Sequence, residues 1–210
     1  MAQSHGPSGA GATRMTSRLT DAFSFAFDAH REQTKKGSAV PYISHLLEVS
    51  GLVLTYGGNE DEAIAALLHD TVEDHPDLVS FQSIGKRFGS KVAQIVESCS
   101  DSTTIPKPPW KPRKERYIEH LRGANESVLM VAAADKLSNV RAVIKDYRQI
   151  GDGVWKRFNA GKSDQLWYYR TVTEALTEAA GTGRAHVLVQ DLKRAVTELE
   201  ELCCGASNPG

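Results

Sequence analysis

Apolar residues spaced three or four positions apart are the feature that most constrains what this chain can fold into. In residues 19–34, for example, Ala22, Ala26 and Ala29 follow this spacing, which places them on one face of an α-helix. Similar spacing continues along most of the chain, whereas the alternation typical of half-buried strands is weak everywhere. The pattern therefore predicts an all-α protein, built as a compact multi-helix bundle.

Helix-capping and helix-breaking residues divide the chain into segments. Pro41 suits the first turn of a helix, Gly57 and Gly58 stop that helix, and Asn59 is a typical N-cap residue for the next one. The apolar run 128–134 fits either a buried strand or a buried helix, and the absence of an alternating partner strand favours a helix. The predicted helices cover residues 19–34, 41–56, 60–73, 81–88, 92–96, 112–121, 128–134 and 185–202.

Composition places the chain among soluble globular proteins of one domain. It has 210 residues, 40% hydrophobic and 24% charged, with a formal net charge of −1, and this near-neutral balance argues against a general nucleic-acid coat. The sequence contains no run of about 18 apolar residues, which is the length that a membrane span needs. The N-terminus lacks the apolar core of a secretory signal. We expect one domain over residues 16–202, with a disordered tail over residues 1–15 and a frayed tail over residues 203–210.

The cysteine pattern indicates a reducing compartment. The three cysteines are Cys99, Cys203 and Cys204, an odd number whose last two members are adjacent, which does not fit a disulfide framework. We therefore expect a cytoplasmic protein.

An imidazole and three carboxylates follow one another at the end of an apolar helix. Glu73 comes four residues after His69, and Asp74 comes four residues after Asp70, so on a helix these side chains project in neighbouring directions. Buried ionisable groups are costly unless they are paired or bound to a metal. Such a density of carboxylates suits a divalent cation.

Two further segments supply side chains of the same kind. His45 follows the segment Pro-Tyr-Ile-Ser at residues 41–44, near the start of a predicted helix. Asp135 directly follows the apolar run 128–134, and Asn139 comes four residues later. His45, His69, Asp70 and Asp135 together make a set of nitrogen and oxygen ligands from three separate helices. Two imidazoles tolerate zinc or iron and two carboxylates suit manganese or magnesium, so the ligand types alone leave the metal open.

The motifs that carry these residues resemble a known family. The segments "PYISH", "AALLHDTVED" and "AADKLSN" resemble the HD superfamily of metal-dependent phosphohydrolases, and more narrowly the ppGpp hydrolase domain of RelA/SpoT-type proteins. The segments "AHREQTKKG", "PWKPRKERYIEHL" and "LWYYR" extend the similarity to the free-standing small alarmone hydrolases. The resemblance covers most of the chain and implies an HD-domain bundle.

This resemblance implies a reaction and assigns residues to it. One metal ion, usually Mn²⁺, would be held by His45, His69, Asp70 and Asp135, and Glu73 and Asp74 would position or deprotonate the attacking water. The substrate, a small purine nucleotide with a 3′-diphosphate, would contact Lys35, Lys36 and Asn139. Looser candidates for phosphate contacts are Lys107, Lys111, Arg113, Lys114 and Lys162.

The expected activity is Mn²⁺-dependent hydrolysis of the 3′-pyrophosphate of (p)ppGpp to GDP or GTP. The segment after residue 180 is too short for a synthetase domain, so we expect hydrolysis without synthesis. A divalent metal lowers the pKa of bound water, and a neighbouring carboxylate can accept its proton. We expect no nucleic-acid partner and no membrane, and the oligomeric state stays open.

Three departures from the family leave alternatives open. Lys35 and Lys36 stand where many relatives have Arg-Lys, residues 38–40 before Pro41 include no acidic residue, and Ser138 stands where a larger residue is common. A lysine stacks on a purine ring less well than an arginine, so the same chemistry on adenine alarmones such as pppApp or pApp is a second candidate. A broader HD nucleotide phosphohydrolase and a non-catalytic alarmone-binding module are the other two.

Overall fold

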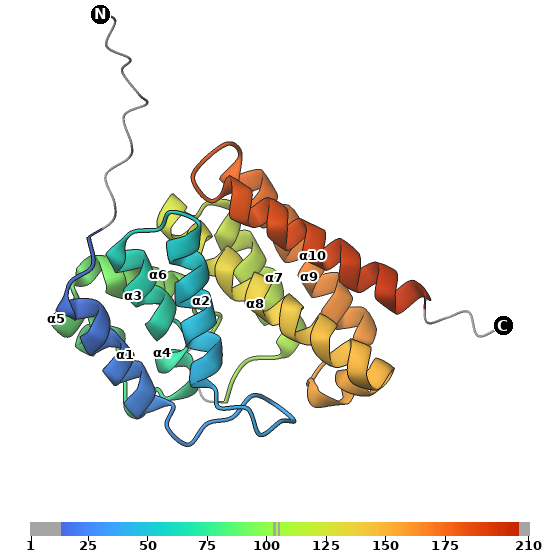
Figure 1. The fold of residues 1–210 in the computed structure, drawn as a ribbon, viewed down its shortest axis with the longest axis horizontal. Helices are drawn as coiled ribbons and strands as arrows, with labels where there is room; N and C mark the ends of the chain where they lie inside the picture. The colour runs from blue at the N-terminus through green and yellow to red at the C-terminus, as the bar shows by residue number, and fades with distance from the viewer. Residues whose placement is uncertain (1–13, 103, 105, 206–210) are drawn as a thin grey trace, which may run out of the picture.

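The structure is a computed structural model that describes residues 14–102, 104 and 106–205 (Figure 1). The described residues form helices and contain no β-strand, only an isolated antiparallel bridge between Thr34 and Pro41. The prediction of an all-α bundle is therefore confirmed. Residues 1–13 and 206–210 of the two expected tails lie outside the described residues, whereas residues 203–205 belong to the last helix.

Most predicted helices are present, with shifted ends. Asn59 caps its helix as predicted, because its side chain accepts from the backbone N–H of Glu62 and the Glu62 carboxylate accepts from the N–H of Asn59. The elements in chain order are α1 (Ser17–Ala29), α2 (Ile43–Thr55), α3 (Glu60–Leu68), α4 (Thr71–Asp74), α5 (Phe81–Phe88), α6 (Ser90–Cys99), α7 (Trp110–Arg122), α8 (Glu126–Ile150), the 3₁₀-helix η1 (Gly151–Arg157), α9 (Lys162–Ala180) and α10 (His186–Gly205).

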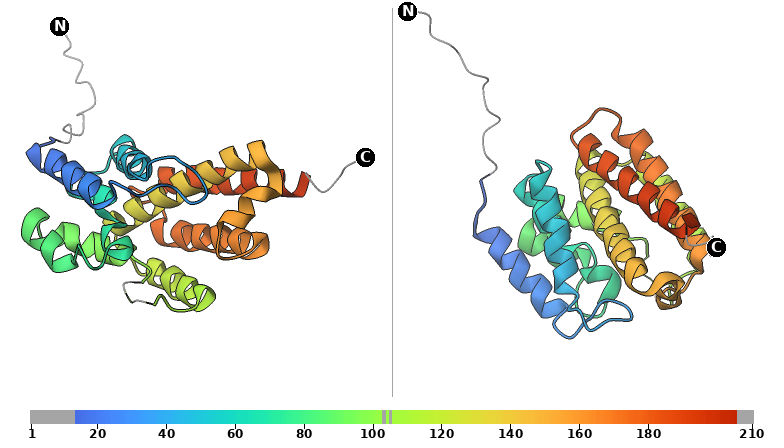
Figure 2. Two further views of the ribbon diagram at one scale, coloured as in Figure 1. Left: turned by 90° about the horizontal axis from the view of Figure 1, so that it is seen from below. Right: turned by 45° about the vertical axis from the view of Figure 1, so that its right-hand side comes forward.

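Helix α8 lies at the centre of the molecule. It contacts α2, α3 and α6 on one side and α9 and α10 on the other, so that the N-terminal and C-terminal helices flank it (Figures 1 and 2). The apolar run 128–134 forms part of this helix, and all seven residues are buried. The helical prediction for this run is confirmed, and its lack of a polar face is explained by neighbours on both sides.

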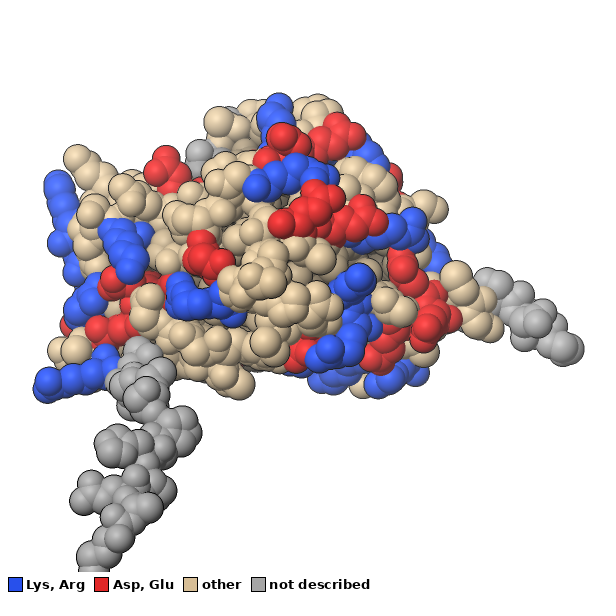
Figure 3. All heavy atoms as spheres, turned by 90° about the horizontal axis from the view of Figure 1, so that it is seen from above, with Lys and Arg blue, Asp and Glu red and all other residues tan. Residues whose placement is uncertain are grey.

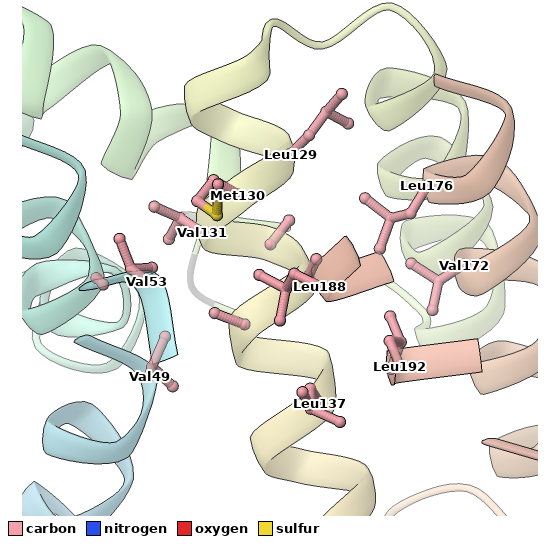
Figure 4. Close-up of a cluster of buried hydrophobic side chains, with 14 of the residues drawn as sticks. Val49, Val53, Leu129, Met130, Val131, Leu137, Val172, Leu176, Leu188 and Leu192 are labelled. Carbon is pink, nitrogen blue, oxygen red and sulfur yellow. The ribbon is translucent and has the colours of Figure 1, made fainter. Parts of the chain in front are cut away.

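The core forms where these helices meet α8. Val49 and Val53 of α2 lie on one side of the helix, and Val172 of α9 and Leu192 of α10 lie on the other (Figure 4). Each of these side chains is fully buried, and burying one such side chain contributes roughly 1.5–3 kcal/mol. The core therefore holds α8 in one position relative to α2. These two helices supply part of the candidate site.

The helix predicted over residues 60–73 is broken, which corrects the sequence analysis. Helix α3 ends at Leu68, and α4 begins at Thr71. The hydroxyl of Thr71 donates to the carbonyl of Leu68 at 2.7 Å, and Nδ1 of His69 bonds to the carbonyl of Ala66 at 2.8 Å. These side chains satisfy carbonyls at a helix end, and the break between the helices contains His69 and Asp70.

The first helix also ends earlier than predicted, at Ala29 instead of residue 34. Residues 30–42 form a loop that returns toward α2. Backbone bonds from Lys35 N–H to Val40 O and from Tyr42 N–H to Gln33 O, both 2.9 Å, close this loop into a narrow hairpin. Its tip contains Lys36 and Gly37.

The surface carries charges of both signs. On the face seen in Figure 3, basic and acidic side chains are interspersed. No helix in the described part of the chain has the length and apolar character needed for a membrane span.

Candidate metal centre and active-site cavity

Three parts of the fold bring the four predicted ligands together. His45 lies on α2, His69 and Asp70 lie at the break between α3 and α4, and Asp135 lies on α8. Nε2 of His45 is 3.2 Å from Oδ1 of Asp135 and 3.7 Å from Oδ2 of Asp70. Nε2 of His69 is 3.0 Å from Oδ2 of Asp70 and 3.6 Å from Oδ1 of Asp135. The predicted ligand atoms thus converge on one point.

Hydrogen bonds orient both imidazoles toward that point. Nδ1 of His69 lies 2.8 Å from the carbonyl of Ala66, which can only accept, so Nδ1 carries a proton, and in the neutral imidazole Nε2 carries the lone pair that can bind a metal. Nε2 of His69 is buried and, among the described residues, makes no hydrogen bond of acceptable geometry, although Oδ2 of Asp70 lies 3.0 Å away. An orphaned nitrogen that faces two carboxylates and a second imidazole fits a divalent cation, since a buried polar atom needs some partner.

The two carboxylates of the cluster are held by their own neighbours. Lys136 donates to Oδ2 of Asp135 at 2.6 Å, Asn139 donates to Oδ1 of Asp135 at 2.5 Å, and the hydroxyl of Tyr42 donates to Oδ2 of Asp70 at 2.5 Å. Asn139 was predicted as a substrate contact, and in the structure it orients the predicted metal ligand Asp135. Sequence reasoning assigned no role to Tyr42 or Lys136, although each lies within a motif that it used.

The cluster has a strongly negative field. Burial alone would lower the pKa of His69, but the carboxylates of Asp70 and Asp135 raise the pKa of His69 well above its usual value. Burial raises the pKa of Asp70, yet the neighbouring His69 holds the pKa of that carboxyl below its usual value. A site that binds a proton this firmly also attracts a divalent cation.

Glu73 and Asp74 extend from α4 beside the cluster. Oε1 of Glu73 lies 2.8 Å from Nζ of Lys107, and its Oε2 accepts from the backbone N–H of Asp101 at 3.2 Å. Burial, followed by repulsion from Asp101 and Asp70, raises the pKa of Glu73 to about 7. Such a carboxyl changes its protonation state near neutral pH, which suits a group that accepts a proton from water.

Asp74 is oriented by a chain of side chains from the other side. Gln33 donates through Nε2 to Oδ2 of Asp74 at 2.8 Å. Oε1 of Gln33 lies 2.6 Å from Nδ1 of His30 and 2.9 Å from Nε2 of His75. His30 and His75 therefore fix this amide, and Gln33 is a neighbour that the sequence analysis missed.

One cavity of about 800 Å³ is lined by His45, Asp70 and Asp135 of the cluster and by both carboxylates of α4. Three parts of the chain close it around the metal cluster: the loop before α2, the start of α7 and the region from α8 to η1. Basic side chains from each part line it, namely Lys35, Lys36, Lys107, Arg113, Lys114, Lys136, Arg141, Lys145 and Arg157. A cavity that combines a cation site with a basic wall suits a polyanionic ligand.

Two of the predicted phosphate contacts lie elsewhere. Nζ of Lys111 lies 3.0 Å from the ring centre of Trp167 and 3.7 Å from Asp164. Lys162 donates to Asp152 at 2.8 Å and approaches the carbonyl of Cys203 at 3.4 Å. Neither lysine is among the residues that line the cavity. These contacts do not support the predicted role of Lys111 and Lys162 in binding phosphate.

The loop that carries Lys35 and Lys36 rests on Arg157 of η1. Gly37 has a φ of +67°, and a Cβ at this position would lie 2.6 Å from Cγ of Arg157. Arg157 is in turn paired with Asp146 of α8. The contact joins the mouth of the cavity to α8, and only a glycine allows so close an approach.

Comparison with known proteins places this geometry in a family. The HD domain family matches residues 22–166. The chain is 39% identical over 126 residues to a guanosine-3′,5′-bis(diphosphate) 3′-pyrophosphohydrolase, MESH1 of Xenopus tropicalis, an alignment that covers 59% of this chain and 68% of the relative.

Two solved structures share the fold. The crystal structure of lmo0812 from Listeria monocytogenes aligns with a TM-score of 0.66 at 28% identity and covers 74% of this chain and 97% of that one. A metazoan ortholog of SpoT, described as hydrolysing ppGpp, aligns with a TM-score of 0.68 at 24% identity and covers 87% and 97% of the two chains. The matched family, the curated relative and the convergent His–Asp cluster agree, and the chain belongs to the HD domain family, in the group that includes the guanosine-3′,5′-bis(diphosphate) 3′-pyrophosphohydrolases.

Proposed function

We propose that this protein removes pyrophosphate from the 3′ position of (p)ppGpp, giving GDP or GTP, with Mn²⁺ bound by His45, His69, Asp70 and Asp135. One observation carries the proposal. His45, Asp70 and Asp135 line one cavity with Glu73, Asp74 and a basic wall. Nε2 of His69 lies 3.0 Å from Asp70, and the chain is 39% identical to a hydrolase named for this reaction.

The metal is part of the proposal. The HD domain implies a divalent cation, and the structure contains a group of His45, His69 and Asp70 whose ligand atoms lie within 4.8 Å of one another. A mixed set of imidazoles and carboxylates suits Mn²⁺. When bound, such an ion polarises a phosphoryl group and lowers the pKa of a coordinated water.

The proton of the attacking water is proposed to go to Glu73. Its pKa of about 7 leaves a share of the carboxyl ionised at neutral pH, ready to accept that proton. Asp74, held by Gln33 at 2.8 Å, would orient the same water. The water oxygen bonds to the phosphorus that carries the 3′-oxygen, and the bond between this phosphorus and the 3′-oxygen breaks. The proton taken up by Glu73 passes to the 3′-oxygen, which becomes a hydroxyl, and pyrophosphate leaves.

The basic wall is proposed to bind the phosphate groups. Lys35 and Lys36 reach the cavity from the loop before α2, Lys107 from the segment before α7 and Lys114 from α7 itself. Positive charges at fixed positions stabilise the charge that develops on phosphoryl oxygens. Lys111 and Lys162 are left out of this set because they lie outside the cavity lining.

A second candidate keeps the reaction and changes the base. Lys35 and Lys36 provide no guanidinium on the loop where many relatives have one, so adenine alarmones such as pppApp are the alternative substrates.

We place the reaction in the cytoplasm, in agreement with three free cysteines.

One assay separates these functions. The purified protein is incubated with Mn²⁺ and, in parallel, with ppGpp, pppApp and GTP, and the products are resolved by anion-exchange chromatography. Pyrophosphate release from ppGpp supports the proposal, and release from pppApp alone moves the substrate to adenine. Loss of phosphate from GTP contradicts it in favour of a general nucleotidase. If the protein binds metal but hydrolyses none of the three nucleotides, the result would favour a binding module.

A further inference from the structure

Ser138 and Glu48 form a hydrogen-bonded chain behind the ligand His45. Nδ1 of His45 lies 3.0 Å from Oγ of Ser138, and the Ser138 hydroxyl donates to Oε2 of Glu48 at 2.9 Å. Ser138 of α8 is fully buried, and Glu48 lies one helical turn after His45 on α2. The chain therefore joins the two helices directly behind the metal cluster.

The direction of each proton in this chain follows from the acceptor at its end. The Ser138 hydroxyl has a single proton, and it donates this proton to the carboxylate oxygen of Glu48. The lone pairs of that oxygen then accept the Nδ1–H of His45. Nε2 of His45 is left with a free lone pair, and it faces Asp135 at 3.2 Å. The chain thus selects the tautomer that can bind a metal.

Removing Glu48 would remove this selection. The Ser138 hydroxyl could then rotate and donate to Nδ1, and the proton of His45 would move to Nε2, where it faces the cluster. His69 has no such dependence, because its Nδ1 bonds to the backbone carbonyl of Ala66. The two imidazoles of the centre are therefore controlled differently, one by the backbone and one by side chains.

We propose that Ser138 and Glu48 are positioning residues that fix the tautomer and orientation of His45 and thereby set the affinity of the centre for a divalent cation. The inference rests on the metal site of the proposed function but not on the identity of the nucleotide. Partners of this kind behind a metal ligand typically change metal affinity by about 10–100-fold.

The alternative is that Ser138 only fills space between α2 and α8. Ser50 provides a matched control for that role. It is also a buried serine and lies on α2, and its hydroxyl donates at 3.0 Å to the carbonyl of Ala63, away from the cluster. Ser50→Ala removes a buried hydroxyl of the same kind without touching a metal ligand.

The test is the metal affinity of the full chain, measured without substrate. Mn²⁺ is titrated by calorimetry into metal-free wild type, Ser138→Ala, Glu48→Ala, Glu48→Gln and Ser50→Ala, and visible spectra are recorded with Co²⁺. We expect Kd for Mn²⁺ to rise about 10–100-fold in Ser138→Ala and Glu48→Ala and the Co²⁺ spectrum to change. The Kd of Glu48→Gln should lie between those of these variants and wild type. Its amide oxygen still accepts a hydrogen bond from Ser138, but its amide nitrogen can also donate one. Ser50→Ala should bind as wild type does.

Two results would overturn the inference. One is a wild-type Kd in both Ser138→Ala and Glu48→Ala, and the other is an equal loss in Ser50→Ala. If Ser138→Ala fails to fold, Glu48→Ala and Glu48→Gln decide, since Glu48 is only half-buried. A wild type that binds Mn²⁺ but hydrolyses no alarmone contradicts the proposed function and leaves this inference standing, whereas a wild type that binds no divalent cation contradicts both.

Discussion

The ammonium group of Lys107 lies 2.8 Å from Oε1 of Glu73. This contact opposes the burial and the neighbouring carboxylates that raise the pKa of Glu73 to about 7. Lys107 comes from the segment before α7 and Glu73 from α4, so packing between distant parts of the chain sets the protonation of the proposed base.

Glu73→Gln tests that base. The amide keeps the size of the side chain but cannot accept a proton from water, so kcat for pyrophosphate release should fall by about 10²–10⁴-fold. The Kd for Mn²⁺ should stay near the wild-type value, since Glu73 is not among the proposed ligands. Steady-state kinetics and calorimetry measure the two quantities, and an unchanged kcat would contradict the role in water activation.

Asp70→Ala tests the metal centre. Asp70 lies 3.0 Å from Nε2 of His69 and 3.7 Å from Nε2 of His45, so its loss should abolish Mn²⁺ binding and turnover together. Chelation of the wild type should stop turnover, and added Mn²⁺ should restore it. Asp77→Ala, at an exposed position outside the cavity lining, serves as the control. An Asp70→Ala protein that still binds Mn²⁺ normally would remove Asp70 from the ligand set.

The parts of the site that sequence predicted are those with a local signature. His45, His69, Asp70 and Asp135 each stand in or beside an apolar helix, where an ionisable residue needs a reason. Asn59 was readable as an N-cap because its side chain bonds to the backbone of the helix that directly follows it. Residues 128–134 fitted a strand or a helix, and the lack of an alternating partner strand favoured the helix. The four ligand atoms meet because α2, α8 and the break between α3 and α4 pack together.

The parts that sequence missed depend on tertiary contacts or on side chains that compete for the backbone. The break after Leu68 arises because His69 and Thr71 bond to carbonyls of the preceding turn, and hydrophobic spacing does not record such bonds. Ser138 and Glu48 are 90 residues apart in the chain. Lys111 and Lys162 share the charge of the cavity lysines, but their direction is set by Trp167 and Asp152.

Gly37→Ala tests the contact between the loop and Arg157. A Cβ would meet Cγ of Arg157 at 2.6 Å, and the φ of +67° is strained for alanine, so the loop with Lys35 and Lys36 should shift. We expect KM for the substrate to rise and kcat to change little. The control is Gly57→Ala, whose φ of +83° is equally strained but whose Cβ would meet no atom within 4 Å.

The two glycine variants separate strain from displacement. Each should lose about 1–2 kcal/mol of unfolding free energy from the strained φ, measured by urea denaturation. Only Gly37→Ala should change KM. An equal KM for Gly37→Ala and wild type would show that the position of this loop does not affect substrate binding.

Asp101→Asn tests the pH dependence of stability. Burial would raise the pKa of Asp101, but Lys114 and Arg113 outweigh it and lower the pKa to about 2. The group is lower in pKa when folded than when unfolded, where about 3.9 is usual, so its stabilisation is present above about pH 4 and is lost as pH falls toward 2. We expect wild type to exceed Asp101→Asn by about 2 kcal/mol in unfolding free energy at pH 7 and the difference to shrink at pH 2.5. Asp28→Asn, which removes an exposed pair with Arg31, should cost little at either pH. A difference between wild type and Asp101→Asn that stays constant with pH would mean that the ionised carboxylate of Asp101 does not stabilise the fold through Arg113 and Lys114.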